Sequence, residues 1–338
     1  MMKRLTVLSV FSIALAFLAT TVTAAPIVVK IGDSTPKTFS YYGPFMTFKK
    51  EVEQKTGGKV DIQYFGEGVL GDQKTLMESC MMGALPMFAA PSSVVQSIVP
   101  ECKIFTLPFV WGNPGILRSF LDGPDGQQMS ALFEKHGMKN LGWGYTGEIG
   151  IQNRKHAVKS PADMKGLKIR VMPDPIMVET INAMGGMGVA MGLGELYSAV
   201  QQGVLDGIST SPQLLDSLKI FEVAKFYTPA NMHYTPALVL VNMKFWGTLP
   251  PDVQRAMTEG MKNWVKNNDD YFLNSSLKTS NEYILTAFKE KGVAVAPLTP
   301  AEAQAFKKTT VSVVQKYRKE IGPDFVDKVL KFTGYKME

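Results

Sequence analysis

The chain has 338 residues, with 36 Lys and Arg against 30 Asp and Glu, which gives a formal net charge of +6 at pH 7. The basic residues are spread along the sequence without a Lys/Arg block. This excludes a nucleic-acid footprint and indicates a mildly basic surface suited to anionic small molecules. The length is sufficient for two domains with their own cores.

The first 24 residues have the organisation of a secretory signal peptide. Lys3 and Arg4 precede an apolar run over residues 5–18, and the segment that ends at Ala24 fits the small-x-small rule for cleavage. The run is too short for a comfortable transmembrane span, and no later run reaches about 20 apolar residues. An uncleaved anchor is the alternative; a lipoprotein anchor is not expected, because no Cys stands at the cleavage site.

We therefore expect a soluble mature chain that begins near residue 25 and is exported to the periplasm. The two Cys residues, Cys80 and Cys102, leave two interpretations open. They form one disulfide, or Cys80 is a buried free thiol in an apolar helix. The three His and two Cys residues lie far apart, so the spacing predicts no metal site.

The first half of the mature chain alternates between strand-like and helix-like segments. These are a strand over 26–32, a helix over 42–56, a strand over 60–65, a helix capped by Asp72, a strand over 85–90, and a helix–strand pair that leads to 105–109. Such alternation predicts a mostly parallel sheet with helices on both faces.

A second α/β unit is predicted after it. Its segments are β-like sequence over 139–145 and 149–153, a strand over 168–171, a helix over 175–184, a strand over 189–191, a helix over 194–202 and a strand over 204–209. The sequence shows no internal repeat and no low-complexity linker.

Residues 251–292 favour one long helix. Gly260 is the only Gly or Pro inside this segment, and an apolar stripe runs from Val253 to Phe288. About 38 helical residues at ~1.5 Å each would span roughly 57 Å, which exceeds one domain. The alternative is two shorter helices with an unmarked break between them.

Residues 142–147 satisfy the dinucleotide pattern G-x-G-x-x-G, but β-like sequence follows instead of the helix that must meet a pyrophosphate. We interpret the segment as a glycine-rich crossing between domains and expect no cofactor. No G-x-S-x-G elbow occurs, and His136, His156 and His233 lack an obvious Ser or Cys partner. An enzyme is therefore not expected. The cluster of Met172, Met177, Met184, Met187 and Met191 indicates pliable core or pocket packing.

Arg170 is the strongest candidate for a functional residue. In the segment MKGLKIRVMPDP, Leu167, Ile169 and Val171 alternate with Lys168 and Arg170, and prolines end the strand. Alternation alone is also consistent with a solvated strand face. However, ligands of open α/β sheets bind beyond the carboxyl ends of strands, where an Arg can hold a carboxylate with two parallel hydrogen bonds.

Several motifs occur together and in order: GEGVLGD at 66–72, VPE at 99–101 with FTLPF at 105–109, KGLKIRV at 165–171, ELYSAVQQGVLDG at 195–207 and KFW at 244–246. With these motifs the chain resembles, from about Val28 to Tyr317, the solute-binding proteins of tripartite ATP-independent periplasmic (TRAP) transporters of the DctP type.

The resemblance implies a two-domain periplasmic-binding-protein-like α/β fold, with crossing strands, a long domain-spanning helix and a cleft that closes on the ligand. We place domain I at 25–147 plus 236–275 and domain II at 148–235 plus 276–330. The resemblance also implies that a small organic acid is delivered to TRAP membrane permease subunits, and that Arg170 binds its carboxylate. We expect a monomer.

Two departures from the family pattern bear on the ligand. Many relatives carry a second cleft Arg where this chain reads EIGI at 148–151, and Glu-Asn before a Pro where it reads ISTSP at 208–212. Thr210 or Ser211 can donate a hydroxyl instead. Losing a cation and an amide favours a monocarboxylate with an apolar or aromatic body over a dicarboxylate or sugar acid. Glu148 either meets a ligand amine or faces water.

The candidate binding set contains the anchor and the polar and apolar residues expected around it: Arg170, Thr210, Ser211, Glu148, Ser34, Pro91, Tyr42, Trp143, Tyr145, Leu193 and Tyr234. C4-dicarboxylate or sugar-acid binding is the alternative function, and an exported hydrolase or lyase is a more distant one.

Overall fold

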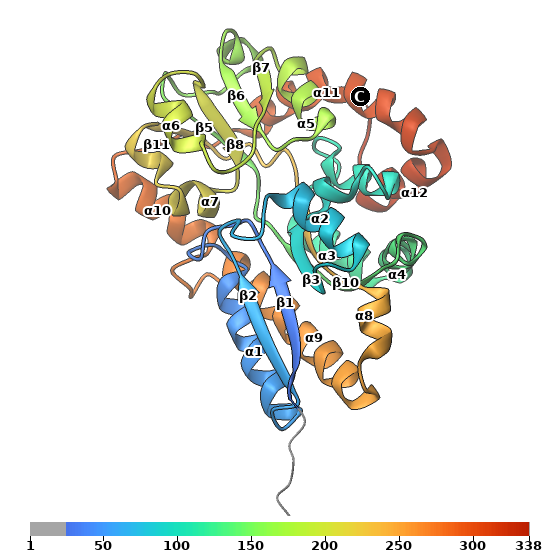
Figure 1. Cartoon of the computed structure of the whole chain (residues 1–338). Helices are drawn as coiled ribbons and strands as arrows, with labels where there is room; N and C mark the ends of the chain where they lie inside the picture. The colour runs from blue at the N-terminus through green and yellow to red at the C-terminus, as the bar shows by residue number, and fades with distance from the viewer. Residues whose placement is uncertain (1–24, 338) are drawn as a thin grey trace, which may run out of the picture.

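The computed structural model describes residues 25–337, so the predicted signal peptide lies outside the described residues. The chain forms two sheets, each the centre of one lobe (Figure 1). The first sheet has the strand order β2 (Val60–Phe65), β1 (Ile27–Gly32), β3 (Met87–Pro91), β10 (Pro236–Asn242) and β4 (Met138–Tyr145). The second has the order β11 (Ala294–Val295), β9 (Phe226–Thr228), β5 (Gly150–Asn153), β8 (Gly207–Thr210), β6 (Lys168–Val171) and β7 (Met187–Ala190).

Twelve α-helices cover these sheets in the described part of the chain. They are α1 (Tyr42–Lys55), α2 (Gln73–Met82), α3 (Pro114–Asp122), α4 (Pro124–Leu132), α5 (Pro175–Ala183), α6 (Leu196–Gln201), α7 (Pro212–Ser217), α8 (Met243–Thr248), α9 (Pro251–Leu273), α10 (Asn281–Glu290), α11 (Pro300–Ile321) and α12 (Pro323–Thr333). Short 3₁₀ helices lie at Ser92–Val95, Pro100–Thr106, Phe133–His136, Pro161–Met164 and Ile220–Glu222. None of the helices within residues 25–337 has the length and apolar character needed to cross a membrane.

The α/β fold class and the crossing strands are confirmed. Strand β4 of the first sheet continues into β5 of the second, and β9 of the second returns into β10 of the first. Each sheet is mostly parallel, as predicted, and the crossings place one strand, β10 in the first sheet and β5 in the second, against the direction of the others. β10 pairs antiparallel with β3 and β4, and β5 pairs antiparallel with β8 and β9, because the outgoing and returning chains run in opposite directions.

The predicted strand over 105–109 is wrong, because a 3₁₀ helix occupies Pro100–Thr106. Phe109 then has a φ of 59°, which no strand residue adopts. Pro108 between them has no backbone N–H to donate to a sheet. This segment packs on the first core through Phe105, whose ring stacks on Trp111 at a centroid distance of 5.5 Å.

The single helix predicted over 251–292 is also wrong, and the alternative of two helices is confirmed as α9 and α10. Asn274 leaves the helix with extended backbone, and its side-chain Oδ1 accepts hydrogen bonds from the N–H and hydroxyl of Ser276. Such local side-chain bonds compete with the helical ladder. Ser280 then caps the next helix through the N–H of Tyr283.

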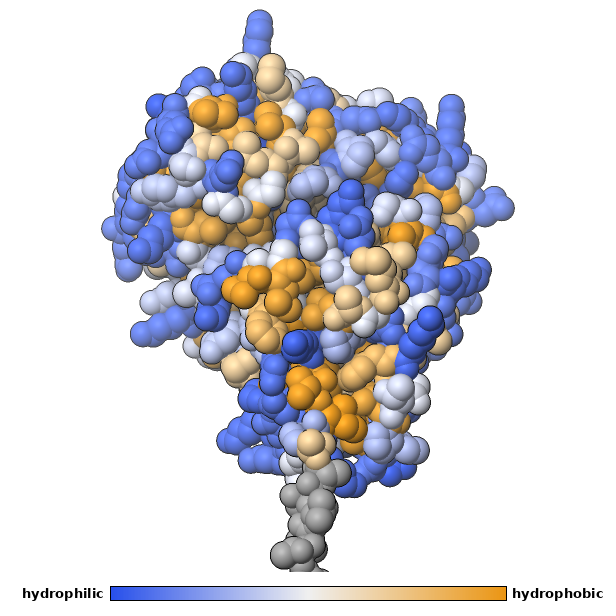
Figure 2. All heavy atoms as spheres, viewed as in Figure 1, coloured by the Kyte–Doolittle hydropathy of each residue, from blue (hydrophilic) through white to orange (hydrophobic). Residues whose placement is uncertain are grey.

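A different helix, α11, packs on both lobes. Phe306 near its start belongs to a core cluster of the second sheet, whereas Val313, Val314 and Tyr317 belong to the core of the first sheet. The domain limits given above remain a prediction. Some large hydrophobic side chains stay exposed, among them Val69 and Met82. Figure 2 shows hydrophobic residues gathered in patches on one face of the molecule, with hydrophilic residues around them.

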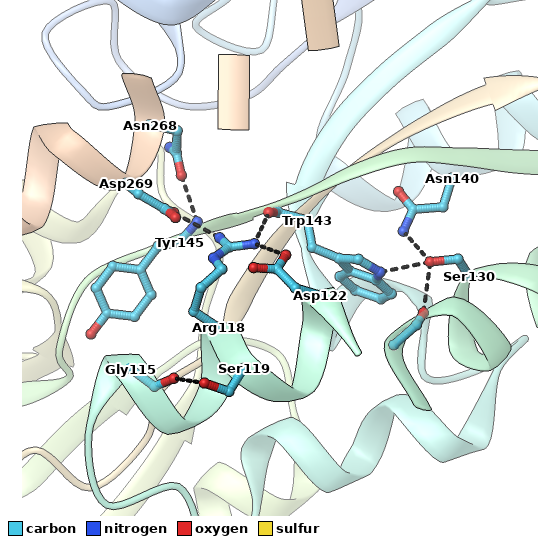
Figure 3. Close-up of polar contacts among 11 residues, drawn as sticks. Gly115, Arg118, Ser119, Asp122, Ser130, Asn140, Trp143, Tyr145, Asn268 and Asp269 are labelled. Carbon is cyan, nitrogen blue, oxygen red and sulfur yellow. Dashed lines mark hydrogen bonds and ion pairs between the residues drawn. The ribbon is translucent and has the colours of Figure 1, made fainter. Parts of the chain in front are cut away.

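The α1 and α9 helices lie side by side on the first sheet, and α9 also packs along β4 (Figure 1). Polar contacts fix α9 in this position (Figure 3). Asn268 Oδ1 accepts the backbone N–H of Tyr145 at 2.5 Å, and Arg118 donates to Trp143 O at 2.9 Å and to Asp269 Oδ1 at 2.8 Å. The helix is therefore hydrogen-bonded to the end of β4, immediately before the chain crosses to the second lobe.

This close approach explains the glycine pattern over 142–147. An added Cβ at Gly144 would stand 2.4 Å from Asn268 Oδ1 and 2.8 Å from Trp264 Cζ3. At Gly147, where φ is +93°, it would stand 2.5 Å from the Cβ of Ser211. The glycines therefore serve helix–strand and interdomain packing, in agreement with the interpretation as a domain crossing.

We expect Gly144→Ala to lower the free energy of unfolding by about 2 kcal/mol, because the new methyl overpacks a rigid contact between β4 and α9. Urea titration followed by circular dichroism measures this loss. Gly43→Ala is the matched control. Nothing lies within 4 Å of its added Cβ on α1, so a gain of up to about 1 kcal/mol is expected. Equal effects of the two variants would contradict the packing explanation.

Candidate functional site

A cavity of about 30 Å³ lies between the two lobes. Its walls come from residues at or beyond the ends of β1, β3 and β4 and the start of α2 on one side, and of β6, β7 and β8 on the other: Thr35, Phe39, Tyr41, Gln73, Pro91, Thr146, Ile149, Arg170, Met172, Leu193, Thr210 and Leu214. This volume accommodates one or two water molecules. A small organic acid therefore fits only if the two walls separate.

Arg170 is a fully buried cation in this wall, with an exposed fraction of 1%. The solvated strand face that alternation allowed is wrong, because β8 and β7 flank β6 and the opposite lobe covers its end. The guanidinium Nε donates to Met191 O at 2.8 Å, while Nη1 has no hydrogen-bond partner among the described residues. Burial lowers the pKa of Arg170 to about 10, so the group stays charged at neutral pH.

Arg170 forms no ion pair with a carboxylate within residues 25–337, and burial is the cause of its lowered pKa. A buried cation with an unpaired donor costs several kcal/mol of folding free energy. The cost is recovered when an anion enters the cavity and accepts the free N–H groups. The geometry of Arg170 therefore suits a carboxylate.

The wall formed by the first lobe contains polar residues such as Thr35 and Tyr41 beside apolar ones such as Phe39. The hydroxyl of Tyr41 is buried and has no hydrogen-bond partner in the described chain. Burial, followed by the nearby charge of Asp33, raises the pKa of Tyr41, so the hydroxyl keeps its proton. It is available to donate to a ligand.

Asp33 lies behind this wall, directly after β1, and is 1% exposed. Its carboxylate accepts hydrogen bonds from the N–H of Thr35 at 2.9 Å, the hydroxyl of Thr35 at 2.5 Å and the hydroxyl of Tyr64. Burial raises the pKa of the Asp33 carboxyl to about 6, and these hydrogen bonds offset part of the rise.

The structure brings four predicted site residues into the cavity wall: Arg170, Thr210, Leu193 and Pro91. Two more, Ser34 and Ser211, precede or follow a wall residue and bury hydroxyls that have no partner in the described residues.

Three other predicted residues gather at the domain crossing instead. The rings of Tyr145 and Tyr234 stack at a centroid distance of 6.4 Å. The charge of Glu148 lies close enough to raise the pKa of both. Burial raises the pKa of the Glu148 carboxyl, although hydrogen bonds to Asn281 and Asn231 lower it. The Glu148 side chain thus lies beside the amides of Asn231 in the second crossing and Asn281 at the start of α10, an arrangement that neither of the two expectations for it described.

The remaining two lie away from the cavity. Trp143 is in the first core, where its indole N–H donates to Ser130 Oγ at 2.7 Å (Figure 3) and its ring packs on Phe105. Tyr42 lies in the first turn of α1 against the ring of Tyr64. Strand and helix periodicity could not separate these aromatic residues from cavity residues, because both kinds are buried or half-buried.

Sequence reasoning did not identify several wall residues as site candidates: Thr35, Phe39, Tyr41, Gln73, Thr146, Ile149, Met172 and Leu214. The strand-end rule was the available signal for Thr35 and Thr146, which follow β1 and β4 closely. Phe39 and Tyr41 lie on a loop, where no periodicity marks the buried face.

The structure also places the other residues that the sequence analysis singled out. Cys80 and Cys102 are both free and buried, so the disulfide interpretation is wrong. The G-x-G-x-x-G segment runs from β4 into the crossing and β5, with no helix after it. His233 is buried, and burial lowers its pKa to about 4. Within residues 25–337, no three His, Cys, Asp or Glu side chains gather into a possible metal site.

Comparison with known proteins gives consistent matches over most of the chain. Residues 31–320 match the family DctP, described as bacterial extracellular solute-binding protein, family 7. A solute-binding protein of Verminephrobacter eiseniae is 31% identical over 301 residues, which cover 87% of this chain and 90% of that protein.

Two solved structures share the fold over their whole length. A TRAP periplasmic solute-binding protein from Ralstonia eutropha, with bound (S)-2-acetolactate, is 26% identical with a TM-score of 0.85, over 91% of this chain and 99% of that one. A TRAP periplasmic solute-binding protein from Sulfurospirillum deleyianum, with bound succinate, is 26% identical with a TM-score of 0.84, over 90% and 99%.

The buried Asp33 carboxyl predicts a pH-dependent stability. Its pKa is raised from 3.8 to about 6 on folding, so the folded state binds the proton more tightly than the unfolded chain. Its contribution to stability is present below the unfolded pKa and is lost as pH rises through the folded pKa. The unfolding free energy of Asp33→Asn minus that of the parent should therefore rise by about 2 kcal/mol between about pH 4 and pH 7.5.

Urea titrations at a series of pH values measure this difference. Asp61→Asn is the control: this carboxyl lies on β2, partly exposed, and its pKa is lowered, chiefly by a hydrogen bond from Gln63. Its difference profile should be small and of opposite sign. A flat profile for Asp33→Asn would show that the carboxyl ionises as freely in the folded state as in the unfolded one.

Proposed function

The chain belongs to the DctP family of TRAP periplasmic solute-binding proteins, which bind organic acids, and we propose that its own ligand is a monocarboxylate with an apolar or aromatic body. In this proposal Arg170 holds the carboxylate, the lobes close around it, and the closed form is delivered to TRAP membrane permease subunits. The buried, unpaired guanidinium of Arg170 is the observation that carries the proposal.

A single cation supports a single carboxylate. Arg170 is the only Lys, Arg or His side chain in the described cavity wall, and Ile149 lies in the wall at the segment where many relatives carry a second Arg. A second buried carboxylate would have no cation to pair with, and such a group costs several kcal/mol. The relatives do not decide this point, since one of the similar structures holds acetolactate and another holds succinate.

The rest of the wall supports an apolar or aromatic ligand body. Side chains from both lobes contribute apolar surface next to Arg170, and they are Phe39, Ile149, Met172, Leu193 and Leu214. Apolar surface of this kind provides affinity for a hydrocarbon body, while a few polar groups orient it. Thr210, at the end of β8, supplies one hydroxyl on the same side as Arg170.

Closure follows from the small volume of the cavity. The described conformation leaves about 30 Å³, so the ligand must enter while the lobes are further apart. A ligand that contacts both walls binds the closed state more tightly than the open state. It stabilises the closed state by the difference between its binding free energies for the two states. The crossing segments at 146–149 and 229–235, together with the break between α9 and α10, are the connections that can bend.

We expect Arg170→Gln to weaken binding of the native acid about a hundredfold or more, because the carboxylate then enters a desolvated site without its cation. Isothermal titration calorimetry measures this loss. Lys168→Gln, on the same strand but exposed, removes an equal charge outside the cavity and should bind as the parent does. The apo form of Arg170→Gln should be as stable as the parent or more stable, since a buried unpaired charge is gone. Near-normal affinity in Arg170→Gln would remove the anchor assignment.

A thermal-shift screen of organic acids tests the substrate class. Because a ligand that binds only the folded state raises Tm by mass action, monocarboxylates with apolar or aromatic bodies should give larger shifts than C4-dicarboxylates or sugar acids of similar size. The best acid, incubated with the protein and recovered for mass spectrometry, should be unchanged. Larger shifts with dicarboxylates or sugar acids would reverse the preference, and a converted acid would indicate an enzyme.

A further inference from the structure

The wall opposite Arg170 contains a buried acid that the proposed function does not use. Asp33 directly follows β1 in the first lobe and accepts hydrogen bonds from Thr35 and Tyr64. Asp33 forms no ion pair with a cationic side chain among the described residues, and burial, partly offset by hydrogen bonds, raises its pKa. The cavity thus has a cation in one wall and an anion directly behind the other.

Asp33 determines how Thr35 can interact with a ligand. The Thr35 hydroxyl hydrogen points to Asp33 Oδ2, with the two oxygens 2.5 Å apart. A hydroxyl has one hydrogen, so Thr35 Oγ1 retains only lone pairs for other partners. Since Thr35 lines the cavity, this part of the wall offers a hydrogen-bond acceptor.

Tyr41 supplies the complementary donor in the same wall. Its hydroxyl is buried without a partner in the described chain, and its ring is held between Phe39 and Trp264 at centroid distances of 5.6 Å and 6.0 Å. These ring contacts hold the Tyr41 side chain in place in the cavity wall, and its hydroxyl keeps a hydrogen to donate. Acceptor and donor together match a ligand hydroxyl, which donates one hydrogen bond and accepts others.

We infer that the ligand carries a hydroxyl at the end remote from its carboxylate, bound by Thr35 and Tyr41, and that Asp33 determines specificity by orienting Thr35 and repelling a second carboxylate. The inference rests on the proposed function, because it takes the carboxylate to be at Arg170. The inference adds the polar group at the other end of the ligand's apolar body. Like charges brought together in a desolvated site oppose binding strongly, so a dicarboxylate of equal length is rejected.

Calorimetry at about pH 8 with probes matched in length tests the inference. One set is butanoate, 4-hydroxybutanoate and succinate, and the aromatic set is phenylacetate, 4-hydroxyphenylacetate and 4-carboxyphenylacetate. In at least one set, the parent should bind the hydroxy acid about tenfold more tightly than the apolar acid. It should bind the dicarboxylate more weakly than either.

Asp33→Asn should raise dicarboxylate affinity relative to the apolar acid by about tenfold or more, since the repelling charge is gone. Asp61→Asn is the matched control. Asp61 lies near the start of β2, at the opposite end of the β1–β2 pair from Asp33, so this variant should discriminate between the acids as the parent does. Thr35→Val should reduce the affinity of the hydroxy acid to that of the apolar acid. Thr35→Ser, which keeps the hydroxyl, should restore the preference, and circular dichroism confirms that each variant is folded.

Failures of the two proposals are distinguishable in the same experiment. If Arg170→Gln binds all probes as the parent does, the proposed anchor is wrong. If binding depends on Arg170 but Asp33→Asn leaves the affinity for the dicarboxylate relative to the apolar acid unchanged, the inference is wrong. It is also wrong if 4-aminobutanoate binds more tightly than 4-hydroxybutanoate, or if neither hydroxy acid binds more tightly than about 1 mM.

Discussion

A buried guanidinium without an anionic partner is the constraint on which the cavity depends. Arg170 is 1% exposed, and within the described chain only Met191 O accepts one of its hydrogens. Such a group lowers stability, and a protein retains it where the charge is needed for another purpose. The strand that carries it lies between β8 and β7, so its backbone is fixed on both sides. Arg170 is therefore held rigidly where a carboxylate can reach it.

The two lobes meet at this charge because the chain crosses between them in several places. At the first crossing, Gly144 lets Asn268 of α9 approach β4 closely enough to accept the Tyr145 N–H. At the second, Asn231 lies beside Glu148. The half-buried carboxyl of Glu148 thus lies between the two crossing segments and is not part of the cavity wall.

The cavity is electrically asymmetric along the direction between the lobes. Arg170 provides positive charge in one wall, and Asp33 provides negative charge behind Thr35 in the other. Both groups are buried, so solvent screens them weakly. A ligand that is anionic at one end and neutral but polar at the other matches this field. The same asymmetry destabilises the unliganded protein, because neither charge has an oppositely charged partner in the described residues.

The sequence by itself determined the α/β class, the position of Arg170 at the end of its strand and the crossing role of residues 142–147, because periodicity, prolines and glycines act locally. The family motifs then identified the function class. Only the tertiary structure decided that Tyr41, Thr35 and Ile149 share a cavity with Arg170, and that Trp143 belongs to the core. Which buried side chains face the same space depends on strand order and on how the lobes meet. That arrangement joins residues far apart in the chain, and no local pattern encodes it.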